Sequence, residues 1–222
     1  MNLPSLLLDL GNRHAKWARP GLQQVIRVPL ESTQIEASVR AVLQAAASLC
    51  EAPGSVLAAS VAPRWAAQLE PALSAAGYIW HSLGPERVPL QRKSEGTGVD
   101  RLLCAWRAYR MQGGPVIVAS LGTAFTLDAT DAAGCFHGGA IGPGLGVQEA
   151  ALAAAAPHLP PPDPDWRPGR VPARSAEAIA CGTRGALARA LSALADEFEQ
   201  TLGSASCARI VTGGDAQRLL PL

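Results

Sequence analysis

Two short glycine segments, each directly after a run of β-forming residues, have the composition of a phosphate-binding turn. Residues 9–12 (DLGN) follow a run of leucines, and residues 121–124 (LGTA) follow the run VIVAS at 116–120. Glycine lets a ligand approach the backbone closely, and successive amide groups can then point at phosphate oxygens. Two such turns, alike in pattern and far apart in the chain, predict two hairpins that hold one nucleotide from two related subdomains. This indicates a phosphotransferase.

Asp9 is the candidate ligand of a magnesium ion. A carboxylate at the end of a buried strand can hold Mg²⁺, usually through water, while the turn amides and Lys16 contact phosphate oxygens. Residues 9–16 equally fit an ordinary hairpin in which Asp9 hydrogen-bonds to its own turn, because Asp-x-Gly is common in turns. For this motif by itself, the ordinary hairpin is the better supported interpretation.

A second acidic residue, Asp100, lies at the start of a predicted helix in the segment GVDR at 98–101. It either complements the helix dipole or accepts the proton of a substrate hydroxyl. A carboxylate is a weak base but is sufficient for phosphoryl transfer, because in the loose transition state the hydroxyl proton is removed only late. Arg101 offers a planar fork to a substrate carboxylate. Taken singly, the segment narrowly favours the structural role.

Two further glycine segments carry weaker signals. Residues 137–144 (HGGAIGPG) end a strand at a point where a ligand or another backbone must approach closely. Residues 212–216 (TGGDA) end a strand and open a helix, which suits contact with the ribose or α-phosphate of a nucleotide. Thr123 adds a hydroxyl and an amide at the second phosphate turn.

Strand and helix patterns alternate along the chain, which argues for an α/β fold. The two halves repeat one plan of hairpin, strand, helix, strand and helix. The expected strands are 4–9, 15–19, 24–29, 55–60, 116–120, 124–129, 135–140 and 209–212. The expected helices are 33–50 with Ser32 or Thr33 as N-cap, one from Pro63, 99–111, 147–156 and 176–202, and the proline-rich loop 157–172 is expected to be mobile and exposed.

Composition excludes several classes of partner. The 222 residues are 48% hydrophobic with a net charge of +1, and no basic cluster stands beside aromatic residues, so a nucleic-acid partner is not expected. Neither a signal peptide nor a stretch long enough to cross a membrane is visible. Five cysteines without a CxxC pair indicate reduced thiols of a cytoplasmic protein.

Taken together and in this order, the segments resemble the type III pantothenate kinases, a branch of the superfamily of acetate kinase, sugar kinases, Hsp70 and actin. The resemblance runs from Leu6 to about Leu220 and rests on residues 9–12, 98–101, 122–124, 138–144 and 212–216. It implies an α/β fold of two related ribonuclease-H-like (actin/Hsp70/sugar-kinase-like) subdomains, each a mixed sheet with flanking helices. Residues 1–98 would form the N-terminal ATPase subdomain, and residues 99–222 the C-terminal subdomain with a dimerisation helix.

The resemblance also implies an activity, the ATP-dependent phosphorylation of pantothenate to 4′-phosphopantothenate at the start of coenzyme A biosynthesis, by a homodimer. Asp100 would be the catalytic base, and Asp9 would serve Mg²⁺. ATP would be bound by Asp9, Leu10, Gly11, Asn12, Arg13, His14, Ala15, Lys16, Gly122 and Thr123. Pantothenate would be bound by Gln91, Gly98, Val99, Asp100, Arg101 and Ser175.

Several positions depart from the family pattern. Ser120 stands where an aspartate normally binds the activating monovalent cation, K⁺ or NH₄⁺, so affinity for that cation should be reduced or absent. Gln91 replaces a usual tyrosine, Arg13 a small Thr or Ser, and Ser175 a threonine. The chain also ends at Leu222, sooner after the last glycine motif than family members usually do, so a closing strand or helix is expected to be missing.

Two alternative functions remain open. A non-catalytic relative, acting as a binding or regulatory protein as the name Bvg accessory factor suggests, is favoured by the loss of aspartate at position 120. Another small-molecule kinase of the superfamily, for sugars or carboxylates, fits the two hairpins equally well. The intact Asp100 argues against the first alternative, and the position of residues 98–101 between the two hairpins argues against the second.

His14 and three arginines of the proline-rich loop are interpreted as solvent-exposed residues without a catalytic role. His14 is expected to be a solvent-facing turn residue, because nothing in the sequence pairs with it. Arg167, Arg170 and Arg174 are expected to lie in a solvated loop, with assistance to phosphate binding as the alternative.

Overall fold

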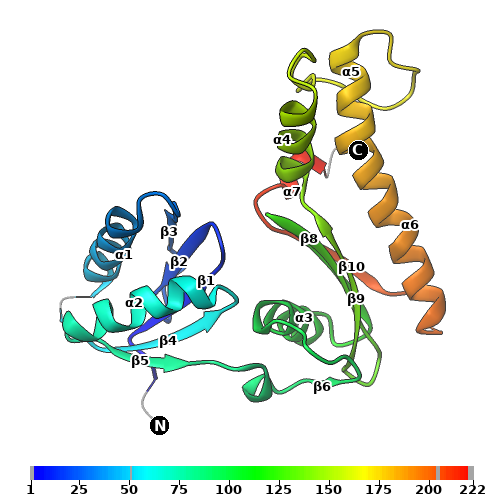
Figure 1. Cartoon of the computed structure of the whole chain (residues 1–222). Helices are drawn as coiled ribbons and strands as arrows, with labels where there is room; N and C mark the ends of the chain where they lie inside the picture. Colours follow the sequence, from blue (N-terminus) through cyan, green and yellow to red (C-terminus); the bar gives the residue numbers. More distant parts are fainter. Residues whose placement is uncertain (1–2, 51, 204–205, 220–222) are drawn as a thin grey trace. The chain divides into compact units, whose positions relative to one another are not determined.

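The protein, here a computed structural model, folds into two compact units (Figure 1). The structure describes residues 3–50, 52–203 and 206–219. The first unit comprises Met1–Val88 with Gly98–Asp100, and the second comprises Pro89–Thr97 with Arg101–Leu222. The chain passes from one unit to the other between residues 88 and 89, between 97 and 98 and between 100 and 101. Each unit contains one mixed five-stranded sheet with helices packed against it, as the sequence predicts.

The first unit has the strand order β3-β2-β1-β4-β5, with β1 to β3 antiparallel and β1, β4 and β5 parallel. Alternate leucines of β1 are buried beneath the helices, and each contributes about 2 kcal/mol of burial free energy. The elements are β1 (Leu6–Leu10), β2 (His14–Ala18), β3 (Val25–Pro29), α1 (Ile35–Leu49), β4 (Ser55–Ser60), α2 (Pro63–Ala75) and β5 (Ile79–Ser82), followed by a 3₁₀ turn (Pro85–Arg87).

The second unit has the strand order β10-β7-β8-β9-β6. Strands β7 to β9 are antiparallel, and β10 runs parallel to β7. Strands β10, β7, β8 and β9 therefore have the same arrangement as strands β4, β1, β2 and β3 of the first sheet. The fifth strand, β6, pairs with β9 at the opposite edge. The elements are β6 (Gln91–Arg92), α3 (Val99–Gln112), β7 (Val116–Leu121), β8 (Ala124–Thr130), β9 (Cys135–Pro143), α4 (Leu145–Ala155), α5 (Ser175–Ala180), α6 (Ala186–Thr201), β10 (Ala208–Thr212) and α7 (Ala216–Leu219).

Strand β7 is buried on both faces, because helices cover both sides of the second sheet. Ile117 and Leu121 pack with α6 on one face, whereas Val116 and Val118 pack against α3 on the other. The continuous apolar run of this strand reflects that double coverage. Its last residue but one, Ser120, lies on the α3 face, two positions beyond Val118.

The long helix expected at 176–202 is interrupted, which corrects the sequence prediction. Residues Cys181–Gly185 form a wider, π-helical turn between α5 and α6. A Cβ at Gly185 would lie 2.6 Å from the ring of Trp166, so glycine lets the loop tryptophan pack against the helix at this point. The contact joins positions far apart in the chain, so periodicity alone does not reveal it.

Two local predictions are also corrected. The N-cap of α1 is Gln34, not Ser32 or Thr33, and Ser38 Oγ instead accepts the backbone N–H of Glu31. The proline-rich loop is not uniformly exposed, because only 4% of Trp166 is accessible. Among the described residues, no helix has the length and apolar character needed to cross a membrane.

Candidate functional site

The first glycine turn joins β1 to β2 and brings Asp9 opposite Lys16. The Lys16 ammonium donates a hydrogen bond of 2.7 Å to Asp9 Oδ2, and both side chains are about 40% exposed. The turn itself is closed by the Gly11 N–H, which donates to the His14 carbonyl at 3.0 Å. The Asp9 carboxylate therefore meets a cation across the strand pair, whereas the ordinary-hairpin interpretation predicted a bond to its own turn.

Several basic residues surround this turn. The pKa of His14 lies below its ordinary value because of burial first, and then because of the positive charges of Arg27, Lys16 and Arg13. The imidazole is half-buried and not solvent-facing as the sequence suggested. The positive charges of Arg13, Lys16 and Arg27 around the turn create a local positive potential, which suits an anionic ligand such as a phosphate.

The second turn, between β7 and β8, is the meeting point of three glycine motifs. Gly122 N–H donates to the Ala124 carbonyl at 3.1 Å, and Gly144 N–H donates to the Thr123 carbonyl at 2.9 Å. From the third motif, Asp215 N–H donates to the Leu121 carbonyl at 3.2 Å. Segments that the sequence singled out separately thus form one site within the second unit.

Close packing of backbone explains two of these glycines. A Cβ at Gly144 would lie 1.8 Å from the Gly122 carbonyl oxygen, and one at Gly213 would lie 2.1 Å from the Leu121 carbonyl oxygen. Gly213 also has a φ of +101°, which L side chains rarely adopt. Both positions therefore require glycine for the turn to form.

Glycine at the two turn positions themselves is not required by the protein. A Cβ at Gly11 would lie 3.6 Å from its nearest neighbour and one at Gly122 would lie 3.9 Å away, which are ordinary contacts. Neither residue has a positive φ. A Cβ at either position would therefore make only ordinary van der Waals contacts, and packing within the protein does not account for the glycine at either turn.

Asp100 stands in the first turn of α3, half-buried, beside Gly98. A Cβ at Gly98 would lie 2.6 Å from Asp100 Oδ1 and 3.2 Å from the Val61 side chain. The glycine therefore leaves room for the carboxylate in its present rotamer. Val99, between them, is buried.

Arg101 is held by a residue that the sequence analysis missed. Its Nε donates to Asp128 Oδ1 at 3.1 Å, and its Nη2 also donates to that carboxylate. Asp128 lies on β8 and is 2% exposed, whereas the Arg101 side chain is 13% exposed. One edge of the guanidinium fork is thus engaged inside the protein. The signal for Asp128 was a charged residue within the otherwise β-forming segment 124–129.

Two hydroxyl groups stand side by side at the predicted cation position. Ser120 and Thr126 are directly paired between β7 and β8, and the Oγ and Oγ1 atoms are buried without a hydrogen-bond partner among the described residues. Neither oxygen carries a charge. This pair therefore fits a tightly held monovalent cation poorly, since no carboxylate stands at position 120 to balance its charge.

Gln91 and Ser175, which the sequence predicts to bind pantothenate, are exposed, whereas Leu10 and Ala15 of the first turn are buried. Gln91 is on β6 and pairs with Cys135 of β9, and Ser175 is the first residue of α5. The arginines at 170 and 174 extend into solvent as expected, but both hydrogen-bond to the buried Glu177 at 2.8 Å. These two arginines therefore fasten the loop to α5.

The chain is similar to known proteins over most of its length. The family described as type III pantothenate kinase matches residues 5–197. The type III pantothenate kinase of Laribacter hongkongensis is 34% identical over 225 residues, covering 96% of this chain and 88% of the relative. That of Chromobacterium violaceum is 32% identical, covering 97% and 90%. The match to the enzyme of Synechococcus sp. strain JA-3-3Ab, at 37% identity, covers 64% of this chain and only 58% of the relative.

A solved structure shares the fold. The crystal structure of a conserved putative Baf family transcriptional activator from Campylobacter jejuni superposes with a TM-score of 0.65 at 18% identity, over 96% of this chain and 85% of that one. At this identity the likeness concerns the arrangement of strands and helices only.

Proposed function

The chain belongs to the type III pantothenate kinase family, and on this premise we propose that it phosphorylates pantothenate with ATP, the first step of coenzyme A biosynthesis. The observation that carries the proposal is the pair of glycine turns, one in each unit, at which a Cβ on Gly11 or Gly122 would make only ordinary contacts. Such turns present backbone amides to phosphate oxygens. Packing does not require glycine at either position, which supports close approach of a ligand to the backbone there.

The first turn supplies positively charged side chains that can bind the phosphate groups of ATP. Arg13, Lys16 and amides of the turn other than that of Gly11, which donates to the His14 carbonyl, would contact phosphate oxygens, and Asp9 would hold Mg²⁺. The half-exposed carboxylate is a hard oxygen donor, which is the ligand type that this ion prefers. When bound, the ion neutralises part of the phosphate charge. Gly122 and Thr123 would contact the nucleotide from the second unit.

The transfer step needs one base. The hydroxyl oxygen of pantothenate attacks the γ-phosphorus of ATP, the bond from that phosphorus to the β–γ bridging oxygen breaks, and Asp100 takes the hydroxyl proton. Gln91, Gly98, Val99, Arg101 and Ser175 would contact pantothenate. Because Asp128 engages one edge of the Arg101 guanidinium, that buried pair fixes the direction in which the arginine meets its substrate.

Further features belong to the same proposal. The enzyme would act as a cytoplasmic homodimer, with α6 contributing to the interface. A monovalent cation would contribute little, because Ser120 and Thr126 offer only neutral oxygens.

A coupled assay for ADP release tests the proposed function. The wild-type protein should turn over with pantothenate in the absence of K⁺ and NH₄⁺, and addition of either cation should change the rate little. Replacing pantothenate by a sugar or by acetate should abolish ADP release. ATP binding without turnover on pantothenate under any cation would overturn the proposal in favour of a binding or regulatory role.

A further inference from the structure

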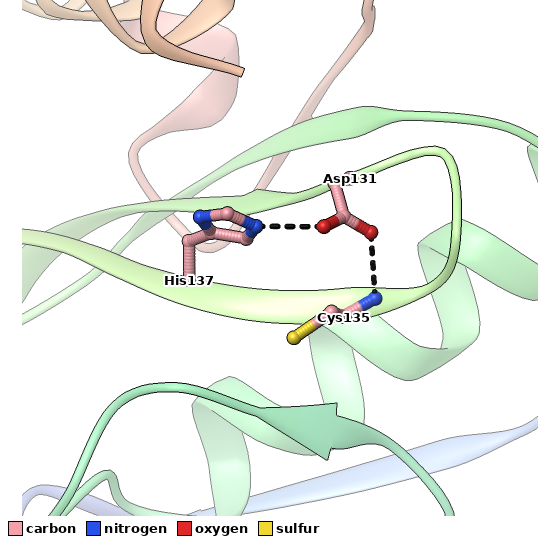
Figure 2. A group of neighbouring side chains, drawn as sticks. All are labelled: Asp131, Cys135 and His137. Carbon is pink, nitrogen blue, oxygen red and sulfur yellow. Dashed lines mark hydrogen bonds and ion pairs between the residues drawn. The ribbon is translucent and has the colours of Figure 1, made fainter.

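A separate polar cluster lies on the hairpin between β8 and β9. Asp131, Cys135 and His137 each offer one ligand atom, and these atoms lie within 4.8 Å of one another (Figure 2). No other group of this kind occurs in the part of the chain that the structure describes. The cluster is remote from the second phosphate turn, because β9 extends from Cys135 to Pro143 and the stretch of strand from His137 to Pro143 spans roughly 20 Å.

The hairpin fixes the Asp131 carboxylate. Its Oδ1 accepts the backbone N–H groups of Ala133 and Cys135 at 3.0 Å and 2.9 Å, and its Oδ2 lies 2.7 Å from His137 Nε2. The Asp131 carboxylate therefore already faces the His137 imidazole, as Figure 2 shows.

A β-bulge aims the histidine at the carboxylate. The register of the strand pair passes from Ala129 opposite Gly138 to Thr130 opposite Phe136, which leaves His137 as the extra residue. Gly138 has a φ of +98°, which accommodates the distortion. A bulge redirects a side chain out of the regular alternation, and such features are usually functional rather than accidental. The bulge in β9 thus determines the direction in which the His137 imidazole points.

We propose that Asp131, Cys135 and His137 bind a zinc ion or a similar borderline-soft divalent metal ion, with water as the fourth ligand. Thiolate, imidazole and carboxylate are the three ligand types of zinc sites, at bond lengths that place ligand atoms about 3.3–3.8 Å apart around a tetrahedron. Atoms within 4.8 Å reach this spacing by small side-chain rotations. A hard ion such as Mg²⁺ is disfavoured by the sulfur and nitrogen donors.

The positive charge of Lys93 lies close to the proposed site and disfavours the binding of a metal cation. Its ammonium lies 3.4 Å from His137 Nε2, which is the same atom that faces Asp131. The lysine side chain is exposed and long, so it can swing into solvent when a metal arrives, at a cost in affinity. Removing its charge should therefore tighten metal binding.

Cobalt titration of the metal-free full-length protein tests the proposal, because a thiolate bound to Co²⁺ gives a charge-transfer band in the near ultraviolet and tetrahedral Co²⁺ gives strong visible absorption. The wild type should show both bands at one equivalent of Co²⁺. Added Zn²⁺ should abolish them, and a large excess of Mg²⁺ should not. Cys135→Ser should lose the charge-transfer band. Cys181→Ser, which alters another half-buried thiol, should keep it.

Two further variants sharpen the result. His137→Ala should weaken Co²⁺ binding and lose the tetrahedral spectrum, whereas Lys93→Gln should bind Co²⁺ several-fold more tightly than wild type. Circular dichroism of the metal-free variants verifies that each is folded. Absence of the charge-transfer band from wild type, its persistence in Cys135→Ser, or an unchanged affinity in Lys93→Gln would each overturn the assignment. Because the readout is spectroscopic, failure here is distinguishable from failure of the kinase assay.

Discussion

The buried pair of Arg101 and Asp128 shows how a residue next to the proposed base is held in place. Asp128 is 2% exposed, so its charge is acceptable only because the guanidinium donates two hydrogen bonds to it. Arg101 directly follows Asp100 in the first turn of α3. An interaction with β8 therefore orients the segment that carries the proposed catalytic residue.

Removal of the buried carboxylate should be costly. Asp128→Ala removes the buried carboxylate that accepts hydrogen bonds from the Arg101 guanidinium, which should lower the free energy of unfolding by about 3–5 kcal/mol. Urea denaturation measures the change. The matched control is Asp196→Ala, which removes an exposed partner of Arg209 and should cost at most about 1 kcal/mol. Equal losses in the two variants would show that the Arg101 pair has no special structural role.

The proposed base has a direct test. Asp100→Asn keeps the size of the side chain but cannot accept the hydroxyl proton, so kcat should fall by about 10²–10⁴-fold. The dissociation constant of ATP, measured by calorimetry, should stay close to that of wild type, because the proposed phosphate contacts lie elsewhere. Wild-type turnover by this variant would show that another group takes the proton.

At the scale of elements, glycines of two kinds surround the phosphate turns. Gly144 is required by its contact with the carbonyl of Gly122, whereas Gly11 has ordinary space around it. The sequence pattern alone does not distinguish these cases, because both are a glycine after a strand. The distinction depends on which backbone segments pack together, and the structure supplies it.

This distinction predicts opposite effects of one substitution. Gly11→Ala should leave the free energy of unfolding within about 1 kcal/mol of wild type but weaken ATP binding, because the methyl group occupies space proposed for the ligand. Gly144→Ala should lower the melting temperature markedly, since its Cβ would lie 1.8 Å from a carbonyl oxygen. Thermal denaturation and ATP titration of both variants measure the two effects. Unchanged ATP affinity in Gly11→Ala would contradict the assigned role of the first turn.

The loop before α5 depends on Glu177. Hydrogen bonding from Arg174, followed by the backbone amide of Ala173, lowers the pKa of Glu177 from 4.5 to about 2. A lowered pKa means that the ionised form stabilises the folded state. This contribution is fully present above the unfolded pKa and is lost as the pH falls from about 4.5 towards 2.

Glu177→Gln should therefore be less stable than wild type at pH 6, and the difference should shrink as the pH is lowered through this window. Urea denaturation at several pH values measures it. Glu197→Gln, on the exposed side of α6, is the control and should show no such pH-dependent difference. A constant difference between Glu177→Gln and wild type across the whole range would mean that the charge of Glu177 does not stabilise the loop.

At the scale of the whole molecule, sequence reasoning succeeded where the signal is local. The apolar runs at 55–60 and 116–120 and the turns after them predicted strands of both sheets, because period and glycine placement act within a few residues. It failed where two distant segments meet. The break at 181–185 packs against Trp166 of the preceding loop, and Asp128, the partner of Arg101 on α3, lies on strand β8. No pattern within one window contains such pairs.

The proposed nucleotide contacts likewise come from segments that are far apart in the sequence, one in each unit. If one ATP molecule contacts residues 10–13 and 122–124 together, Mg·ATP should slow amide hydrogen exchange in both turns with the same dependence on ATP concentration. The reason is that bound phosphates shield the turn amides in each unit. Native-state exchange followed by mass spectrometry resolves the two peptides. Asp100→Asn should show the same protection as wild type, because its change affects proton transfer and not the phosphate contacts. Protection confined to one turn would mean that the nucleotide is held by a single unit, and the two-turn site would have to be abandoned.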